Sequence, residues 1–394
     1  MRVGLAREAL NYDCRQRHDL RAVCVAGNVK PALTKRTKAL FLPAFGFTVN
    51  RNLAPVSFQC CPSFAMGSRE APFRLHNRAK SSIESVGRGR HAPSDMRFQT
   101  SVQGKCMEEQ WTVLKVLQWT KEYFKGRGFE QPRADAEVLL AHALGMERVQ
   151  LYLNYDKPLS PEELARFRGF VRRRAAYEPP QYITGKKEFW SLDFEVTPAV
   201  LIPRPETEVL VEKALEIAGN KPSLVLDLGA GSGAIAVALA HERSGIRVIA
   251  VDKSWPAIEV ARKNAMRNGV AERISFVVMD LFEAFGTGAL FDLIVSNPPY
   301  VSDAEFLDLA PEIANYEPLS ALRGGGKQGL ALIGKILQRF HHHLKPEGSF
   351  LMEIGLGQAE ILEEGFLSDL AGRYEFIEDY SGVKRVLHVR GKGV

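Results

Sequence analysis

The sequence has no cysteine after residue 106. Its five cysteines are Cys14, Cys24, Cys60, Cys61 and Cys106. Residues 107–394 therefore cannot form disulfide bonds or thiolate metal sites, which fits a reducing compartment. The sequence also lacks a long apolar run, because its most apolar stretch, residues 39–49, is too short to span a membrane and contains Pro43 and Gly46. We expect no membrane-spanning helix.

Acidic residues are scarce at the start of the chain. Residues 1–106 hold eighteen Lys and Arg against six Asp and Glu, a net charge of +12. Residues 107–394 hold the remaining thirty-four basic residues (52 − 18) against forty acidic ones (46 − 6), a net charge of −6. A chain of 394 residues has room for two or three domains. The change in composition predicts a boundary between residues 106 and 107.

We predict that residues 1–106 form a disordered basic extension, because they show no sustained period of 2 or 3.6 residues. Three interpretations remain open. The segment is an extension upstream of a true start at Met107, an organellar transit peptide, or a basic tail that binds nucleic acid. The expected location is the cytoplasm, or the mitochondrion or plastid if the segment is a transit peptide.

Residues 107–180 have a helical pattern and are predicted to form a small N-terminal domain. Apolar residues recur at helical spacing, glycines at 126 and 128 end the first helix, and Pro132 and Pro161 suit the starts of two more. The run Arg172-Arg173-Arg174 is interpreted as a solvated helix face. Residues 181–200 are predicted to be a β-hairpin linker, since apolar residues alternate from Phe189 to Val196.

Residues 201–394 alternate strand and helix, which predicts a Rossmann-like α/β domain. Apolar runs mark strands at 223–228, 247–252, 274–279, 291–296, 348–354, 374–380 and 385–390. Only Ser381 to Lys384 separates the last two, which is too short for a parallel crossover, so they should pair antiparallel. A mainly parallel seven-stranded sheet with an antiparallel last strand is typical of class I methyltransferases that use S-adenosylmethionine.

Polar or ligand-covering groups follow four successive strands of this domain. The first strand leads into Gly229, Ala230, Gly231, Ser232 and Gly233, a turn in which glycines allow close approach of a ligand to backbone N–H groups. The second ends at Asp252, which is placed to accept hydrogen bonds from ribose hydroxyls. Leu281 follows the third. Because ligands bind at the carboxyl ends of parallel strands, these positions predict a nucleoside site.

The fourth strand ends in Asn297, Pro298, Pro299 and Tyr300. The two prolines hold the loop stiff and extended. A planar amide could then donate its N–H groups to the Asn297 side-chain oxygen and to a proline carbonyl, while the Tyr300 ring covers its face. The run of histidines at 341–343 is interpreted as a solvated helix end and not as a metal site, and no metal is expected.

Several stretches of the chain form a specific set of motifs. They are Glu188-Phe189-Trp190, residues 196–208 with Pro-Arg-Pro-Glu-Thr-Glu at 203–208, residues 227–233, residues 297–300, Glu317-Pro318 with Ala321-Leu322, and Glu353-Ile354-Gly355. In these stretches the chain resembles the HemK/PrmC-type release factor glutamine methyltransferases. The family usually has Asp-Gly after the glycines at 324–326, whereas this chain has Gln328-Gly329. This loop therefore has no carboxylate at the position where the family has one. The resemblance covers residues 107–394.

The resemblance implies methyl transfer from S-adenosylmethionine to the side-chain amide nitrogen (N5) of the glutamine in the Gly-Gly-Gln motif of class I peptide chain release factors. It implies that the helical domain recognises the release factor and that Asn297, Pro298 and Tyr300 are catalytic. The substrate pocket would consist of residues 297–300. Cofactor-binding residues would be Gly229, Ala230, Gly231, Ser232, Gly233, Asp252, Leu281 and Asn297. The protein is expected to act as a monomer.

Two other functions fit parts of the pattern. An exocyclic adenine N–H₂ group in DNA or RNA would fit the same Asn-Pro-Pro-Tyr pocket, which would make the protein an N6-adenine methyltransferase. The acidic body argues against this, because duplex binding calls for a basic surface. The other alternative is a non-catalytic factor that binds a nucleoside or associates with the ribosome. Such a protein would have the methionine end of its cofactor pocket blocked.

Overall fold

The structure is a computed structural model that describes residues 110–286 and 288–393. The predicted extension at residues 1–106, its three interpretations and the boundary at 106/107 lie outside the described residues. No helix in the described ranges is long and apolar enough to cross a membrane.

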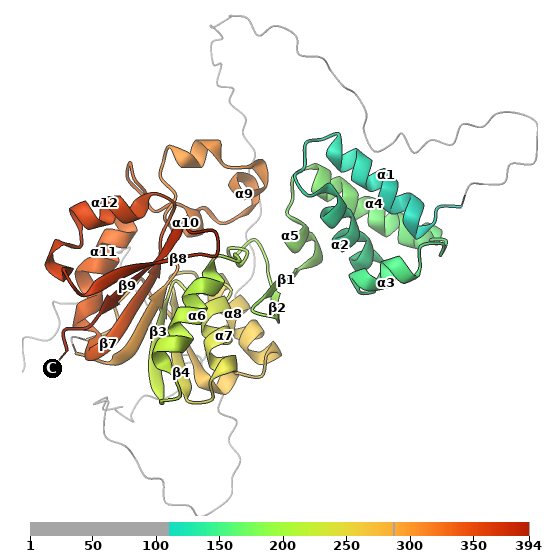
Figure 1. The fold of residues 1–394 in the computed structure, drawn as a ribbon. Coiled ribbons are helices and arrows are strands. Elements are labelled where there is room, and N and C mark those ends of the chain that lie inside the picture. The colour runs from blue at the N-terminus through green and yellow to red at the C-terminus, as the bar shows by residue number, and fades with distance from the viewer. Residues whose placement is uncertain (1–109, 287, 394) are drawn as a thin grey trace, which may run out of the picture. The chain divides into compact units, whose positions relative to one another are not determined.

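The first described part is a bundle of helices. Its elements are α1 (Val113–Lys125), α2 (Pro132–Leu144), α3 (Arg148–Leu153), α4 (Pro161–Ala175) and α5 (Pro180–Thr184) (Figure 1). The hydroxyl of Thr112 caps α1, and Ser160 and Glu163 form a capping box at α4. The predicted break after α1 is present, with α1 ending one residue before Gly126. The short helix α3 has no counterpart in the sequence prediction.

The prediction for Arg174 is wrong. Its side chain is only 5% exposed, and its Nε donates to Asp135 at 2.8 Å. The guanidinium lies 4.1 Å from the ring centroid of Phe129, and it also pairs with Glu312. A buried guanidinium needs such partners, because losing its hydration without them is costly. Arg173 pairs with Glu178 and is half-exposed, as a solvated helix face requires.

A two-stranded hairpin follows the helices. It consists of β1 (Lys186–Phe189) and β2 (Leu192–Glu195), which pair antiparallel. Trp190 and Ser191 both have positive φ, 54° and 56°, as the tight turn of a two-residue hairpin requires. The hairpin occupies less of residues 181–200 than predicted, because residues 180–184 form α5. Pro180 favours a helix start, and Gly185 ends the helix with φ of 72°.

The larger part is built on a seven-stranded sheet. Its strands are β3 (Ser223–Leu228), β4 (Ile246–Asp252), β5 (Ile274–Val278), β6 (Phe291–Ser296), β7 (Leu344–Glu353), β8 (Tyr374–Glu378) and β9 (Lys384–Arg390), in the order β5-β4-β3-β6-β7-β9-β8. The pairs from β5 to β7 are parallel, and β9 is antiparallel to both β7 and β8. The predicted class I methyltransferase sheet is confirmed.

Helices cover both faces of this sheet. One face packs against α6 (Thr207–Ala218), α7 (Ala234–Glu242) and part of α8 (Trp255–Arg267), and the other against α11 (Ala331–Arg339) and α12 (Gln358–Gly365) (Figure 1). Consecutive strand residues serve opposite cores: Val225 belongs to the first and Leu226 to the second. Burial on both sides explains why the strands are nearly continuous apolar runs.

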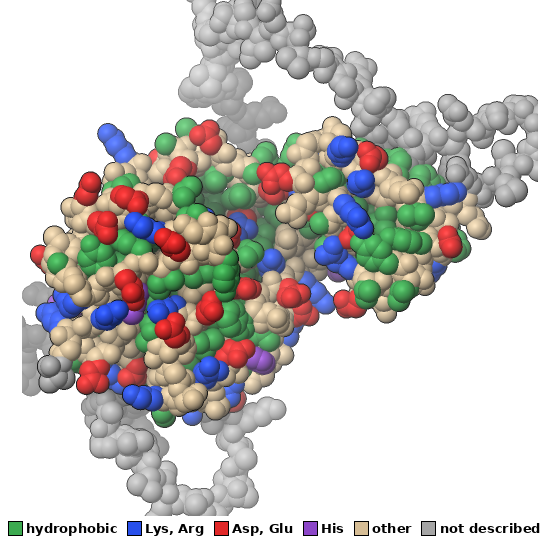
Figure 2. All heavy atoms as spheres, in the orientation of Figure 1, with side chains coloured by type: hydrophobic (Ala, Val, Ile, Leu, Met, Phe, Trp, Pro, Cys, Tyr) green, Lys and Arg blue, Asp and Glu red, His purple; other side chains and the backbone are tan. Residues whose placement is uncertain are grey.

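Short elements connect this framework. They are η2 (Ala271–Arg273), η3 (Glu305–Asp308), α9 (Pro311–Tyr316), α10 (Leu319–Leu322), η4 (Phe340–His342) and η5 (Ser368–Leu370). The prediction of a solvated histidine run fails at His343, which is 3% exposed and stacks on Phe282 at a centroid distance of 4.7 Å. On the face shown in Figure 2, acidic and basic side chains are interspersed.

Candidate active site

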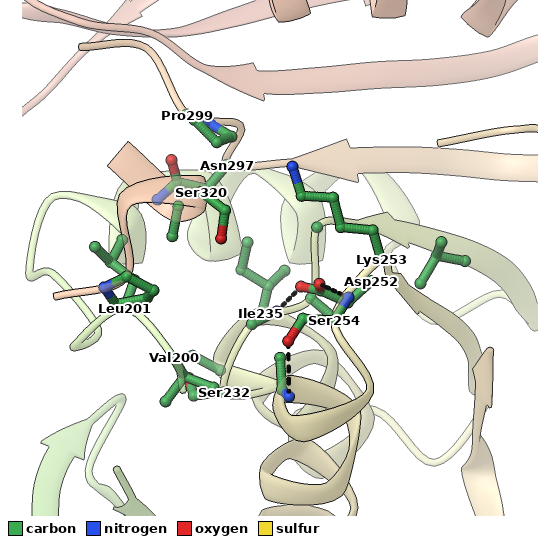
Figure 3. A pocket seen from close by; sticks show the side chains of 18 of the residues that line it. Val200, Leu201, Ser232, Ile235, Asp252, Lys253, Ser254, Asn297, Pro299 and Ser320 are labelled. Atoms are coloured by element: carbon green, nitrogen blue, oxygen red, sulfur yellow. Dashed lines mark hydrogen bonds between the residues drawn. The ribbon is translucent and has the colours of Figure 1, made fainter. Parts of the chain in front are cut away.

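A pocket opens where β3, β4 and β6 end, at the carboxyl edge of the sheet. Figure 3 shows Asn297, Pro299 and Ser320 on one side, Asp252, Lys253 and Ser254 on another, and Val200 and Leu201 along its wall. Its empty space is about 1030 Å³, including the open mouth. A concave pocket in this position is where open α/β sheets bind their ligands.

The glycine turn between β3 and α7 forms the floor of the pocket. Gly229, Gly231 and Gly233 have φ of 79°, 53° and 80°, which side chains rarely adopt. A Cβ on Gly233 would lie 3.0 Å from the Cβ of Ala261. The turn thus needs glycine both for its conformation and for its packing on α8.

Asp227 lies near the end of β3 and binds the first turn of α7. Its Oδ2 accepts the backbone N–H of Ala236 at 3.2 Å, and its Oδ1 has no partner within the described ranges. The carboxyl is fully buried, and burial raises its pKa to about 7, with the charge of Asp252 as a smaller contribution in the same direction.

Asp252 faces the pocket from the end of β4. Its Oδ2 accepts the backbone N–H of Gly231 at 2.9 Å, and its Oδ1 accepts that of Ser254 at 2.8 Å. Burial raises the pKa of Asp252, and these backbone N–H groups act in the opposite direction. Each carboxylate oxygen can accept more than one hydrogen bond, so both remain able to bind the hydroxyls of a ribose.

Leu281 lines the pocket after β5 in an uncommon backbone conformation, with φ of 45°. The next residue, Phe282, is fully buried and stacked on His343. This anchor holds the chain so that Leu281 presents an apolar surface to the pocket beside Met279 and Val251. Such a surface suits the flat ring of a nucleobase.

The Asn297 side chain is held in one orientation. Its Nδ2 donates to Oγ1 of Thr207 at 3.0 Å, and its Oδ1 has no hydrogen-bond partner among the described residues. The Thr207 hydroxyl donates in turn to Oε2 of Glu353 at 2.7 Å. An amide oxygen at the pocket wall is therefore left to accept an N–H group of a ligand.

Glu353 lies behind this wall and is 1% exposed. Besides Thr207, it accepts the hydroxyl of Tyr300 at 3.4 Å. Burial raises the pKa of Glu353 to about 7, and these two hydrogen bonds act against that rise. Burial also raises the pKa of Tyr300, with the Glu353 charge as the next cause.

The backbone of the Asn-Pro-Pro-Tyr loop packs against glycines. A Cβ on Gly329, which has φ of 71°, would collide with the carbonyl oxygen of Tyr300. That oxygen accepts Nε2 of Gln358 at 3.0 Å. Neither the Pro298 nor the Pro299 carbonyl accepts a backbone hydrogen bond in the described ranges, and the Pro299 carbonyl faces Gly324. The Pro298 carbonyl is thus a candidate for a second acceptor.

The structure brings most of the predicted site residues to one pocket. Those that line it are Gly229, Ala230, Gly231, Ser232, Asp252, Leu281, Asn297 and Pro299. Gly233, Pro298 and Tyr300 are outside this lining. The Tyr300 ring packs on Gly355 instead, where an added Cβ would lie 3.1 Å from its Cδ2.

Sequence reasoning missed one whole wall of the pocket. It consists of Ala199, Val200, Leu201, Pro203, Arg204, Thr207, Pro318, Ser320 and Ala321. Arg204 joins its two segments by pairing with Glu317, whose other oxygen accepts the backbone N–H of Ile202 at 3.3 Å. Glu206 does not line the pocket. The Pro-Arg-Pro-Glu-Thr-Glu stretch was the signal, but its spacing alone does not tell which side chains face inward.

The residues present fit S-adenosylmethionine. Asp252 offers acceptors for ribose hydroxyls, the segment around Leu281 offers an apolar surface for adenine, and the glycine turn leaves room for the methionine part. The last of these spaces adjoins Asn297, since the Cβ that Gly229 lacks would lie 4.0 Å from the Asn297 carbonyl oxygen. A ligand held there would place its methionine end next to the amide.

Comparisons with known proteins agree with this geometry. Residues 115–185 match the family model of the PrmC N-terminal domain, and residues 205–368 match that of the methyltransferase small domain. The chain is 50% identical over 252 residues to the release factor glutamine methyltransferase of Geobacter sulfurreducens, covering 64% of this chain and 87% of that protein. It is 38% identical over 288 residues to that of Rhodopirellula baltica, covering 71% and 96%.

Among solved structures, the chain is similar to the protein-(glutamine-N5) methyltransferase (release factor-specific) of Alicyclobacillus acidocaldarius. The identity is 29%, the TM-score is 0.31, and the match covers 50% of this chain and 99% of that chain.

Proposed function

The chain belongs to the release factor glutamine methyltransferases, and on this premise we propose that it methylates the glutamine N5 in the Gly-Gly-Gln motif of class I peptide chain release factors. It is an S-adenosylmethionine-dependent protein-(glutamine-N5) methyltransferase. One observation supports the proposal for the site. Oδ1 of Asn297 has no hydrogen-bond partner among the described residues, and Asn297 lines the same pocket as the glycine turn.

The difficulty of the reaction lies in the substrate amide. Its nitrogen lone pair is delocalised into the carbonyl, so the nitrogen is a poor nucleophile, and no ordinary side chain can deprotonate it beforehand. When bound, S-adenosylmethionine supplies an electrophilic methyl group. The chain's own contribution is to hold the nitrogen in line with that group, and good orientation supplies several of the roughly 7–11 kcal/mol available from proximity.

Asn297 and Pro298 provide this orientation in the proposal. Oδ1 of Asn297 accepts one N–H of the substrate amide and the Pro298 carbonyl accepts the other, which fixes the amide plane and directs the lone pair at the methyl group. Pro299 supplies part of the wall, and Tyr300 supports the loop through Glu353 and Gly355. As the nitrogen gains the methyl group it gives up one proton.

The helical part, residues 110–180 of the described chain, is proposed to recognise the release factor. Val149 and Leu153 on α3 are 64% and 79% exposed. Large apolar side chains with this exposure are suited to contact with a protein partner. For the compartment, we propose the cytoplasm, or the mitochondrion or plastid if residues 1–106 act as a transit peptide; sequencing the natural N-terminus tests this.

The experiment is a transfer assay with labelled S-adenosylmethionine. The full chain should label a class I release factor and should leave unlabelled a release factor whose Gly-Gly-Gln glutamine is changed to Ala. Adenine-containing DNA and RNA form the third arm. Label in nucleic acid and none in the release factor would replace the proposal with adenine methylation. Gel filtration with light scattering tests the expected monomer.

A further inference from the structure

Thr207 connects Asn297 to a buried acid that does not touch the pocket. We infer that Glu353 and Thr207 are positioning residues: together they decide which end of the Asn297 side-chain amide faces the substrate. The inference rests on the proposed function and extends it to the two residues that hold the Asn297 side chain.

The donor count fixes the direction of the relay. A threonine hydroxyl has one proton to donate. An ionised Glu353 can only accept hydrogen bonds, so it accepts the one that the Thr207 hydroxyl donates, at 2.7 Å. The Thr207 oxygen is then left to accept, and it accepts Nδ2 of Asn297 at 3.0 Å. Oδ1 of Asn297 consequently faces the pocket, where it can accept an N–H of the substrate.

Protonating Glu353 makes the reverse relay available, because a neutral acid has a proton to donate. When the acid donates to the Thr207 oxygen, the Thr207 proton points toward Asn297. In that arrangement Asn297 turns its Oδ1 to Thr207, which leaves its own N–H₂ group facing the N–H₂ group of the substrate. Two donors cannot bond, so the substrate is no longer oriented.

The position of Glu353 makes this reversal accessible near neutral pH. Burial and four neighbouring groups act on the pKa of its carboxyl. The groups are the Thr207 hydroxyl, the carboxylate of Glu206 before α6, the guanidinium of Arg385 on β9 and the hydroxyl of Tyr300. Burial and Glu206 favour the neutral acid, whereas the other three favour the anion. The result is a pKa of about 7.

Thr207→Val tests the relay, because valine has nearly the shape of threonine without the hydroxyl. We expect kcat on the release factor to fall about 10- to 100-fold, while the Kd for S-adenosylmethionine, measured by calorimetry, stays within about threefold. Thr207→Ser keeps the hydroxyl and should restore kcat to within about threefold of wild type. Unchanged kcat in Thr207→Val, or an equal loss of cofactor affinity, would overturn the inference.

Thr120→Val is the matched control. Thr120 is fully buried in the helical bundle, and its hydroxyl has no partner within the described ranges. This variant should keep both kcat and the Kd of wild type.

Glu353→Gln tests the acid itself, and also serves if Thr207→Val does not fold. In wild type, kcat should decline as pH falls below about 7, because the anion is the form that orients Asn297. Glutamine does not titrate, so this acid limb should disappear in the variant. An acid limb that persists unchanged would contradict the role of Glu353.

One readout does not depend on the reaction. The side-chain N–H₂ resonances of Asn297 can be assigned in ¹⁵N spectra by their loss in Asn297→Asp, and they should shift in Thr207→Val and change with pH through 7 in wild type. Resonances that respond to neither would refute the relay even if the release factor is methylated. If they respond but no release factor is labelled, the proposed substrate fails and the relay stands.

Discussion

The side-chain amide of Asn264 on α8 donates a hydrogen bond of 2.9 Å to the carbonyl oxygen of Ser232 in the glycine turn. The same Nδ2 donates to the carbonyl of Glu195 at 3.0 Å, and Oδ1 accepts the Glu195 N–H at 2.7 Å. One fully buried side chain thus ties the hairpin strand β2 to the floor of the pocket.

Asn264→Ala should destabilise the fold and weaken cofactor binding. The change leaves the buried carbonyl of Ser232 and the partly buried backbone groups of Glu195 without this partner, and an unsatisfied buried group costs about 1–3 kcal/mol. We expect a loss of about 2–5 kcal/mol in the free energy of unfolding, measured in urea, and a higher Kd for S-adenosylmethionine. Asn154→Ala, at an exposed helix end, should cost less than about 1 kcal/mol. Equal losses in the two variants would show that Asn264 does not have this role.

Asp252→Asn should weaken S-adenosylmethionine binding without unfolding the protein. Asparagine retains an acceptor for one of the two backbone N–H groups but removes the charge and one acceptor from the ribose side. Hydrogen bonds to charged groups are worth about 1.5–3 kcal/mol, which corresponds to a Kd roughly 10- to 150-fold higher by calorimetry. The exposed Asp303→Asn is the control and should bind as wild type does. A Kd unchanged in Asp252→Asn would remove this residue from the cofactor site.

Gly329→Ala should reduce kcat because a Cβ at this position collides with the Tyr300 carbonyl and must displace the Asn-Pro-Pro-Tyr loop. Gly326 has a similar φ, 77° against 71°, but a Cβ there meets nothing within 4 Å. Both alanine variants carry the cost of a left-handed backbone, about 1 kcal/mol, and only Gly329→Ala adds the collision. We expect kcat to fall at least tenfold in Gly329→Ala and less than threefold in Gly326→Ala. Equal activity of the two would mean that the loop tolerates the displacement.

Glu137 should make stability depend on pH under acidic conditions. Burial alone would raise its pKa, but hydrogen bonds from Arg148, Tyr152 and Arg133 outweigh burial and lower the pKa from 4.5 to about 2. A pKa lowered by folding means that the stabilisation is complete above pH 4.5 and is lost as pH falls toward 2.

Urea unfolding at a series of pH values checks this. Wild type should lose more stability than Glu137→Gln between pH 4.5 and 2, because glutamine has no proton to gain. Above pH 5 the variant should be the less stable of the two, since it leaves three donors with a weaker acceptor. Parallel curves for the two proteins would show that this network contributes nothing to folding.

Local patterns in the sequence predicted the sheet and the centre of the site. The strands are continuous apolar runs because helices bury them on both faces, and the residues that follow them meet at one edge because parallel strands end together. Gly229, Asp252, Leu281 and Asn297 therefore line one pocket, as their positions after successive strands predict.

Only the tertiary structure decided how those side chains are held. Thr207 and Glu353 are 146 residues apart, and Asn264 and Ser232 are 32 apart, so no periodicity links the partners. The same applies to Arg174 and His343, which the sequence alone predicts to be exposed to solvent. In the structure Arg174 pairs with Asp135 and His343 stacks on Phe282, and both partners are distant in the sequence. A hydrogen bond or a stacked ring depends on where the backbone brings two side chains in space. Composition and spacing describe only the order of residues along the chain, so they do not predict which distant side chains meet.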